Sequence, residues 1–222
     1  MEARYERNIP ALSEEECARL RSKRVAVIGC GGLGGHLIEL LARIGVGRLC
    51  VVDGDVFEPS NLNRQLYSSP ELLGCGKAKA AAERVRRINP EIALDTVEGF
   101  LTRENARALI AGCDAALDAL DSIGSRRILA EACQAEKIPY IYGAVSGWVA
   151  QAAISMPGDG LIGQLYPDDA VLHSKSVLSF TPALCASVQA ALCVKLLTDR
   201  PVETGKLFYF DLLHQEFEVI TL

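Results

Sequence analysis

The sequence lacks the cysteine and histidine spacings from which proteins build metal sites. Eight cysteines occur among the 222 residues, but no two of them form a C-x-x-C pair. The three histidines, His36, His173 and His214, are scattered without a ligand spacing. A metal site made only of protein side chains is therefore not expected, and in a reducing compartment most of the cysteines are expected to be small buried residues.

Targeting segments and an excess of positive charge are missing as well. The N-terminus, MEARYERNIP, has no basic stretch followed by an apolar run, and no apolar stretch reaches the roughly 18 uninterrupted residues that a membrane span needs. The formal net charge of −5 argues against nonspecific binding to nucleic acid. These absences predict a cytoplasmic protein that binds neither membranes nor nucleic acid.

Alternating apolar runs and helical patterns predict an α/β fold with a mostly parallel sheet flanked by helices and a late pair of strands. The length favours one domain, preceded by an N-terminal helical arm over residues 1–23. The last predicted helix is apolar nearly all round, which suits burial against the sheet or a partner subunit. Strands are expected at 24–28, 48–52, 93–98, 115–118, 140–142, 148–156, 207–210 and 217–221, and helices at 34–43, 77–88, 104–111, 125–136 and 182–197.

A glycine-rich turn follows the first predicted strand. The run from Gly29 to Gly34 reads GCGGLG, the G-x-G-x-x-G spacing that lets backbone amides approach a phosphate at a helix N-terminus. Asp53 follows the second strand, at about the distance where a carboxylate meets a ribose hydroxyl. Taken alone, this pattern is typical of a dinucleotide-binding oxidoreductase, although the glycines can also serve only the turn and close packing.

The connection after the second strand is abnormally long. Such loops usually run about 2–6 residues, but GDVFEPSNLNRQLYSSPELLGCG separates Asp53 from the helix that begins at Lys77. If this loop folds back, Arg64 and Lys77 meet near the glycine turn. Hydride transfer has little use for two cations, whereas a phosphoryl or nucleotidyl transferase needs them at the phosphates. A dehydrogenase is therefore the least favoured function.

A carboxylate follows the fourth predicted strand, at the edge where parallel α/β sheets bind ligands. Asp121, in LDALDS, is a candidate Mg²⁺ ligand, because magnesium takes one or two carboxylates together with phosphate oxygens. The alternative role for Asp121 is to cap the next helix, which Ser122 or Ser125 would do equally well. Asp118 is the alternative magnesium ligand, but it lies nearer the strand interior.

Together these motifs resemble one family. Over essentially its whole length, the chain resembles the ThiF/MoeB/HesA adenylyltransferases, relatives of the ubiquitin-activating enzymes. The motifs that carry the resemblance are GCGGLGG, DGDVFEPSNLNRQ, GKAKAAAERVRRINP, LDALDS and GAVSGWVAQ. The resemblance implies one Rossmann-like adenylation domain over residues 1–222. It also implies binding of ATP and Mg²⁺, and adenylation of the C-terminal glycine carboxylate of a ubiquitin-like sulfur-carrier protein ending in Gly-Gly, with release of pyrophosphate.

The same resemblance assigns roles to individual residues. Gly32 lies under the phosphates, Asp53 holds the ribose, and Asp121 holds magnesium. Asn61 and Asn63 contact phosphate, although as loop residues they can also bond their own backbone. The implied nucleotide site consists of Gly29, Gly31, Gly32, Asp53, Asp55, Asn61, Asn63, Arg64, Gln65, Lys77, Asp121 and Ser122, with Arg64, Lys77, Asp121 and Arg7 as its catalytic residues.

The sequence departs from the family at its cysteines. Many members carry two C-x-x-C pairs that bind structural zinc, but here residues 161–164 read LIGQ in place of the first pair, and no second pair follows. Zinc is therefore not expected. The crossover segment 170–180 has no cysteine, and Cys185 in the apolar helix is expected to be an inert packing residue. The sequence supports adenylation and does not support covalent sulfur transfer.

Two alternative functions stay open. LDALDS resembles the related tRNA threonylcarbamoyladenosine dehydratases, although the acidic net charge and the absence of a basic stretch argue against a tRNA substrate. A scaffold that binds nucleotide without reaction is disfavoured because Arg64, Lys77 and Asp121 are all retained. Similar carrier proteins serve thiamine synthesis, molybdopterin or tungstopterin synthesis, and cysteine synthesis. No residue in the sequence distinguishes between these carriers.

Arg7 predicts a homodimer. The N-terminal arm enters the sheet at the amino end of the first strand, whereas the glycine turn lies at the carboxyl end. Arg7 would have to wrap around its own domain to reach that turn, but a two-fold partner can present it directly. The expected homodimer uses the apolar helix at 182–197 as an interface, and Arg7 of one chain completes the site of the other.

Overall fold

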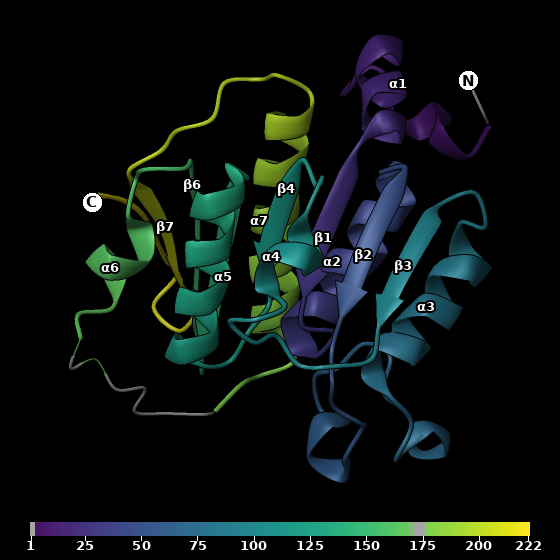
Figure 1. Cartoon of the computed structure of the whole chain (residues 1–222), viewed down its shortest axis with the longest axis horizontal. Coiled ribbons are helices and arrows are strands. Elements are labelled where there is room, and N and C mark those ends of the chain that lie inside the picture. The colour runs from purple at the N-terminus through teal and green to yellow at the C-terminus, as the bar shows by residue number, and fades with distance from the viewer. Residues whose placement is uncertain (1–2, 169, 171–175) are drawn as a thin grey trace.

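A mixed eight-stranded sheet forms the centre of the fold in the computed structural model, which describes residues 3–168, 170 and 176–222 (Figure 1). The strand order is β3-β2-β1-β4-β5-β6-β7-β8. β1 to β5 pair in parallel, whereas β6, β7 and β8 are added antiparallel at one edge, so the predicted fold class is confirmed. The strands are β1 (Arg24–Ile28), β2 (Arg48–Val52), β3 (Ala93–Val97), β4 (Ala115–Asp118), β5 (Tyr140–Ser146), β6 (Val149–Ser155), β7 (Lys206–Asp211) and β8 (Glu216–Thr221).

Helices cover both faces of the sheet because successive strand residues point to opposite sides. Val25 and Val27 of β1 belong to the core cluster that also holds residues of α2, α3 and α7, and Ala26 and Ile28 belong to the cluster that holds residues of α4, α5 and α6. The helices are α1 (Glu14–Ser22), α2 (Gly32–Ile44), α3 (Lys77–Ile88), α4 (Ala106–Ile110), α5 (Ile123–Glu136), α6 (Leu161–Leu165) and α7 (Phe180–Leu197), with 3₁₀ turns η1 (Ala3–Asn8), η2 (Pro59–Asn61) and η3 (Pro70–Leu72).

The sequence prediction differs from the structure at β5, α4 and α6, and it starts α2, α5 and α7 two residues too late. β5 extends to Ser146 because it forms a hairpin with β6, and its glycine and serine hide this continuation in the sequence. α4 is shorter than predicted and begins only after Asn105, whose side chain instead bonds the preceding loop. The prediction missed α6, which has five residues and is therefore too short for a helical period to show.

The N-terminal arm, η1 and α1, packs at the amino ends of the strands. Tyr5 is buried against Gly45, and the Nδ2 group of Asn8 donates to the carbonyl oxygen of Ile44 at 3.2 Å. In Figure 1 this arm and the long loop after β2 lie at opposite ends of the sheet. Arg7 is exposed on the arm, so it lies away from the carboxyl ends of the strands of its own chain.

α7 is a core helix of the domain. Length and composition alone would let it cross a membrane, but half of it is buried, and it packs on α2, β5 and β6. Gln189, from its middle, donates through Nε2 to the carbonyl oxygens of Asp118 at 3.0 Å and Ile141 at 3.1 Å. A Cβ at Gly143 would lie 2.2 Å from the Oε1 atom of Gln189, so the helix approaches the sheet closely at that point.

Seven of the eight cysteines are buried, and Cys75 is exposed. Burial raises the pKa of the Cys185 thiol to about 12, and its Sγ lies 3.2 Å from the carbonyl oxygen of Gln151. This environment suits the packing role that the sequence predicts for Cys185, because the reactive thiolate form is disfavoured. Part of the cysteine-free crossover segment, residues 171–175, lies outside the described residues.

The turn from β1 into α2 requires glycine at two positions. Gly29 has a φ of +102°, a left-handed conformation that side chains rarely adopt, and its N–H donates to the carbonyl oxygen of Val52 at 2.8 Å. A Cβ at Gly34 would lie 1.8 Å from the carbonyl oxygen of Gly29. The helix can therefore start directly above the strand only if both residues lack side chains.

Gly34→Ala should destabilise the fold by about 1–3 kcal/mol or more, because the new methyl group meets backbone that cannot move aside. Urea unfolding of the purified variant measures this loss. Gly124→Ala, in α5, is the matched control: its Cβ would have nothing within 4 Å. There the same substitution should stabilise the helix by about 0.5–1 kcal/mol. Equal unfolding midpoints for the two variants would contradict the packing argument.

Candidate nucleotide-binding site

The carboxyl ends of the parallel strands open into a cavity of about 710 Å³. The turns after β1, β2, β3 and β4 line it, together with the long loop after β2 and the β5–β6 hairpin. This is the edge at which parallel α/β sheets bind ligands. The predicted residues that line it are Gly29, Gly31, Gly32, Asp53, Asp55, Arg64, Gln65, Lys77 and Asp121.

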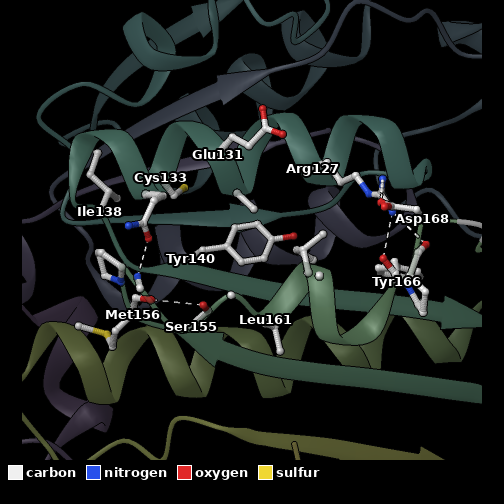
Figure 2. Close-up of a pocket in the computed structure, with 18 residues that line it drawn as sticks. Arg127, Glu131, Cys133, Ile138, Tyr140, Ser155, Met156, Leu161, Tyr166 and Asp168 are labelled. Atoms are coloured by element: carbon white, nitrogen blue, oxygen red, sulfur yellow. Dashed lines mark hydrogen bonds and ion pairs between the residues drawn. The ribbon is translucent and has the colours of Figure 1, made fainter.

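A second cavity of about 700 Å³ lies between α5 and α6 (Figure 2). Buried side chains of Cys133, Ile138 and Tyr140 form its wall, and Tyr166 lines both cavities. The LIGQ segment that replaces the first cysteine pair belongs to α6 beside this cavity. Within the described residues, no group of three or more His, Cys, Asp or Glu side chains is placed to hold a metal ion.

Asp53 joins the glycine turn to the long loop. Its Oδ2 accepts a hydrogen bond from the Cys30 N–H at 2.7 Å, and its Oδ1 accepts one from the Asp55 N–H at 2.8 Å. Burial raises the pKa of Asp53, and these two N–H donors and the Lys77 ammonium oppose that rise. The carboxylate is therefore held in a fixed orientation at the cavity wall, with both oxygens still able to accept a further hydrogen bond.

Lys77 stands at the start of α3 with only 7% of its surface exposed. Its Nζ lies 3.0 Å from Oδ2 of Asp55, and its N–H donates to the Asp55 carbonyl oxygen at 2.9 Å. Val56 and Gly76 pair in an antiparallel bridge, which closes the long loop at its base. The loop therefore brings the Lys77 ammonium back to the end of β2.

Arg64 and Gln65 lie beside the glycine turn. Arg64 Nη1 donates to the Ser60 carbonyl oxygen at 2.9 Å and to Asn63 Oδ1 at 2.8 Å. A Cβ at Gly32 would lie 3.5 Å from Arg64 Cγ. The buried Oε1 atom of Gln65 has no hydrogen-bond partner in the part of the chain that the structure describes. The loop thus folds back over the turn, as the sequence analysis required, and Arg64 and Lys77 line the same cavity.

Three of the predicted contact residues do not line the cavity. Asn61 is buried, and its Oδ1 accepts from the Glu58 N–H at 3.0 Å, whereas Asn63 Nδ2 donates to the Val177 carbonyl oxygen at 3.2 Å. Ser122 caps α5, because its Oγ accepts from the Ser125 N–H at 3.1 Å. All three therefore stabilise the loops around the cavity, and their contacts with a nucleotide stay a prediction.

Asp121 and Asp118 lie in contrasting surroundings. Asp121 is exposed at the cavity, makes no hydrogen bond or ion pair among the described residues, and leaves the capping of α5 to Ser122. Asp118 is fully buried, and its carboxylate is surrounded by donors from Arg126, Tyr140 and the Leu120 N–H. Of the two carboxylates, only Asp121 presents oxygen atoms to the cavity.

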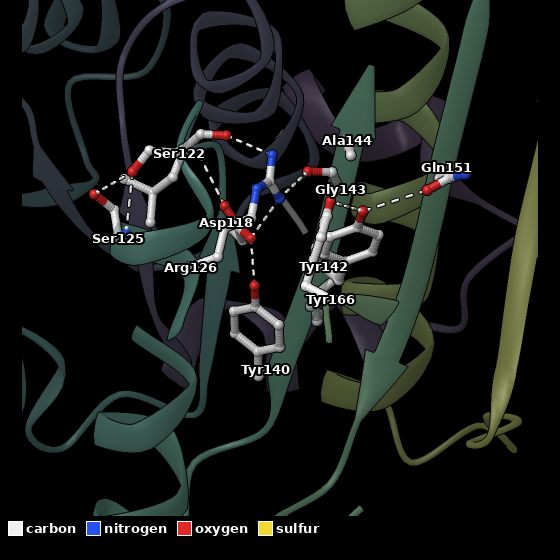
Figure 3. A network of polar contacts seen from close by, with 12 residues as sticks. Asp118, Ser122, Ser125, Arg126, Tyr140, Tyr142, Gly143, Ala144, Gln151 and Tyr166 are labelled. Carbon is white, nitrogen blue, oxygen red and sulfur yellow. Dashed lines mark hydrogen bonds and ion pairs between the residues drawn. The ribbon is translucent and has the colours of Figure 1, made fainter. Parts of the chain in front are cut away.

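Arg126 is a site residue that the sequence analysis missed (Figure 3). Its Nη1 lies 2.7 Å from Asp118 Oδ2 and donates to the Gly143 carbonyl oxygen at 2.7 Å, while Nη2 donates to the Leu120 carbonyl oxygen at 2.5 Å. Burial raises the pKa of Asp118, and the guanidinium and the other donors oppose that rise. The available signal was an arginine in the first turns of the helix that follows a strand-end aspartate.

Tyrosines extend this network toward the second cavity. The hydroxyl groups of Tyr142 and Tyr166 lie 2.6 Å apart, and the Tyr142 hydroxyl donates to Gln151 Oε1 at 3.3 Å (Figure 3). The Arg126 guanidinium carbon lies 5.1 Å from the Tyr142 ring centre. Gln151 and Tyr166 also line the nucleotide-side cavity. Gln151 ends the GAVSGWVAQ motif, to which the sequence analysis assigned no role, and Tyr166 lies outside the quoted motifs.

The fold and this cavity define a Rossmann-like nucleotide-binding domain: a parallel sheet, a glycine turn into a helix, a strand-end carboxylate and two convergent cations. The ThiF family matches residues 5–222. The chain belongs to this family, so the resemblance seen in the motifs is confirmed.

Relatives of known name match nearly the full chain. The SAMP-activating enzyme E1 of Haloferax volcanii is 35% identical over 98% of this chain and 84% of its own. The sulfur carrier protein adenylyltransferase of Thermus thermophilus is 30% identical over 99% of this chain and 86% of its own. The solved structure of Escherichia coli MccB with ATP covers 100% of this chain and 71% of MccB, with a TM-score of 0.82 and 20% identity, and shares the fold.

Arg126→Met should destabilise the protein by about 3–5 kcal/mol, because it leaves the Asp118 carboxylate buried without its counter-charge. Thermal and urea unfolding measure the change. Arg103→Met is the control, since its side chain is 65% exposed and its ion-pair partner, Glu131 of α5, is 58% exposed. That loss should stay below about 1 kcal/mol. Equal losses of unfolding free energy in the two variants would contradict the stabilising role assigned to the buried Asp118–Arg126 ion pair.

Proposed function

We propose that the chain is an ATP-dependent adenylyltransferase that activates the C-terminal glycine carboxylate of a ubiquitin-like sulfur-carrier protein ending in Gly-Gly. The observation that carries this proposal is the folded-back loop, which sets Arg64 and Lys77 beside the glycine turn while Asp121 faces the same cavity. Membership of the ThiF family and the names of the SAMP-activating and sulfur-carrier relatives support this reaction.

The residues around the cavity have separate roles in binding the nucleotide and in the reaction. The amides after Gly31 receive the phosphates at the α2 N-terminus, and Asp53 accepts from the ribose hydroxyls. Arg64 and Lys77 offset the negative charge that builds as a carboxylate oxygen attacks the α-phosphorus and the bond to pyrophosphate breaks. When the nucleotide binds, the Lys77 ammonium leaves the Asp55 carboxylate and contacts a phosphate oxygen. The product is the carrier's acyl adenylate.

Magnesium fits this site on the chemistry of its donors. At the cavity Asp121 offers carboxylate oxygens that have no partner among the described residues, and hard oxygen ligands beside phosphate are what Mg²⁺ takes. When bound, the ion would neutralise charge on the phosphate oxygens. We further propose that the protein binds no zinc and that residues 1–222 form one adenylation domain. Its proposed location is the cytoplasm, without membrane or nucleic-acid partners.

Pyrophosphate exchange into ATP tests the function directly. Exchange should depend on a carrier with a C-terminal glycine, and neither tRNA nor NAD should replace carrier or ATP. Asp121→Asn should lower exchange by about 100-fold or more, because the neutral amide no longer holds the metal. Asp199→Asn is the matched control: Asp199 is exposed and bonds Arg19 of α1, far from the cavity. Exchange that needs tRNA, or that survives in Asp121→Asn, would refute the proposal.

A homodimer in which Arg7 acts on the partner's site belongs to the same proposal. Arg7 lies on an arm at the amino ends of its own strands, so its own cavity is out of reach. α7 offers a surface for a partner, because Phe180 is 42% exposed and Leu184 and Val188 are only partly buried. A two-fold contact there would be isologous.

Mixing two inactive variants tests the exchange of Arg7 between chains. In a mixed dimer of Arg7→Ala and Asp121→Asn, one of the two sites carries both intact groups. Random exchange of subunits should therefore restore about a quarter of the wild-type rate. Mixing Arg7→Ala with the Arg7→Ala, Asp121→Asn double variant supplies the control, because no site in that mixture regains an arginine. If neither mixture recovers while every variant is folded and dimeric, Arg7 does not act in the partner.

A further inference from the structure

Phe100 is an aromatic side chain left open at the nucleotide cavity. It follows β3, lines the cavity and keeps 64% of its surface exposed. Its backbone is nevertheless held on both sides: the Gly99 N–H donates to the Asp53 carbonyl oxygen at 3.2 Å, and Asn105 Nδ2 donates to the Phe100 carbonyl oxygen at 2.8 Å. The ring is therefore presented to the cavity from a fixed position.

One face of this ring is already occupied by the backbone. A Cβ at Gly54 would lie 2.8, 2.8 and 2.9 Å from the consecutive ring atoms Cδ2, Cγ and Cε2 of Phe100. Nearly equal distances to three neighbouring ring atoms place Gly54 under the flat face of the ring and not at its edge. Gly54 has no left-handed φ, so this contact, and not the backbone, is what requires glycine there.

The location relative to Asp53 identifies which part of a nucleotide the ring would meet. Gly54 is the residue after Asp53, so Phe100 lies next to the carboxylate assigned to the ribose. In a nucleotide the base is bonded directly to the ribose. Leu101 and Leu120 also line the cavity, whereas the Lys77 ammonium is directed to the Asp55 carboxylate and Arg64 lies beside the glycine turn. An apolar surface beside the ribose suits a base and does not suit phosphates.

We propose that Phe100 is the platform on which the purine base of ATP stacks, and that Gly54 positions the ring by leaving room beneath it. The inference rests on the proposed function, because it names the base subsite of the same nucleotide cavity. Base–aromatic stacking uses the flat face of the base and suits a ring that has one free face. Phe100 thereby adds affinity for the nucleoside part of ATP and none for the polyphosphate.

Calorimetric titration with ATP and with inorganic tripolyphosphate, both with Mg²⁺, separates base binding from phosphate binding. Phe100→Ala should raise the Kd for ATP about tenfold and leave the Kd for tripolyphosphate within about twofold, as expected for loss of one stacked base. Phe100→Tyr keeps the ring and should retain wild-type affinity. Gly54→Ala should weaken ATP selectively as well, because its methyl group displaces the ring.

Phe217→Ala is the matched control, since Phe217 is equally exposed at 64% but lies on β8, outside the cavity lining. It should change neither Kd. Wild-type affinity for ATP in Phe100→Ala, or an equal loss for both ligands, would overturn the inference while leaving the proposed function intact. A wild-type protein that binds no ATP would overturn both.

Discussion

The buried ion pair between Asp118 and Arg126 is the constraint on which the site depends. Two charges removed from water cost several kcal/mol each unless donors and acceptors surround them, and here a tyrosine, a backbone N–H and two carbonyl oxygens do so. The Arg126 guanidinium bonds the carbonyl oxygen of Leu120, the residue before Asp121. The position of the exposed carboxylate at the cavity is therefore set by a charge pair in which Asp118 is fully buried and Arg126 is only 5% exposed. From the opposite face of the sheet, Gln189 binds the Asp118 carbonyl oxygen, so α5 and α7 are both anchored at the end of β4.

Asp53 has the corresponding role on the other side of the glycine turn. Its two oxygens bind the turn after β1 and the first residues of the long loop, and its backbone pairs with β3 and the residue before Phe100. A single strand-end residue thus aligns three segments that come from distant parts of the sequence. The loop that follows contains two 3₁₀ turns and is closed by a bridge between Val56 and Gly76, so this long connection has local structure of its own.

Most of the parallel part of the fold could be predicted from the sequence because β1, β2 and β4 are nearly continuous apolar runs. β1, β2, β4 and α3 have the predicted bounds. The site residues on the glycine turn and at Asp53, Lys77 and Asp121 could be found because each follows directly on such a strand or loop motif. Tyr166 and Phe100 could not, because they reach the cavity through loop contacts that depend on tertiary structure and leave no spacing in the sequence. Gln151 ends the GAVSGWVAQ motif, and Arg126 follows the strand-end Asp118 by eight residues, but the partners of both side chains are set by the packing of α5 and by the β5–β6 hairpin.

The uneven burial of the cysteines gives the chain a built-in attachment point for a spectroscopic label. Seven thiols lie inside the fold, and Cys75 alone is exposed, two residues before Lys77 in the segment that closes the long loop. A maleimide dye added to the folded protein would therefore react at one position without any engineered cysteine. Because Cys75 belongs to the base of the loop, where its carbonyl oxygen accepts from the Phe57 N–H at 3.0 Å, the fluorescence of the dye would report whether the loop shifts when Lys77 leaves Asp55.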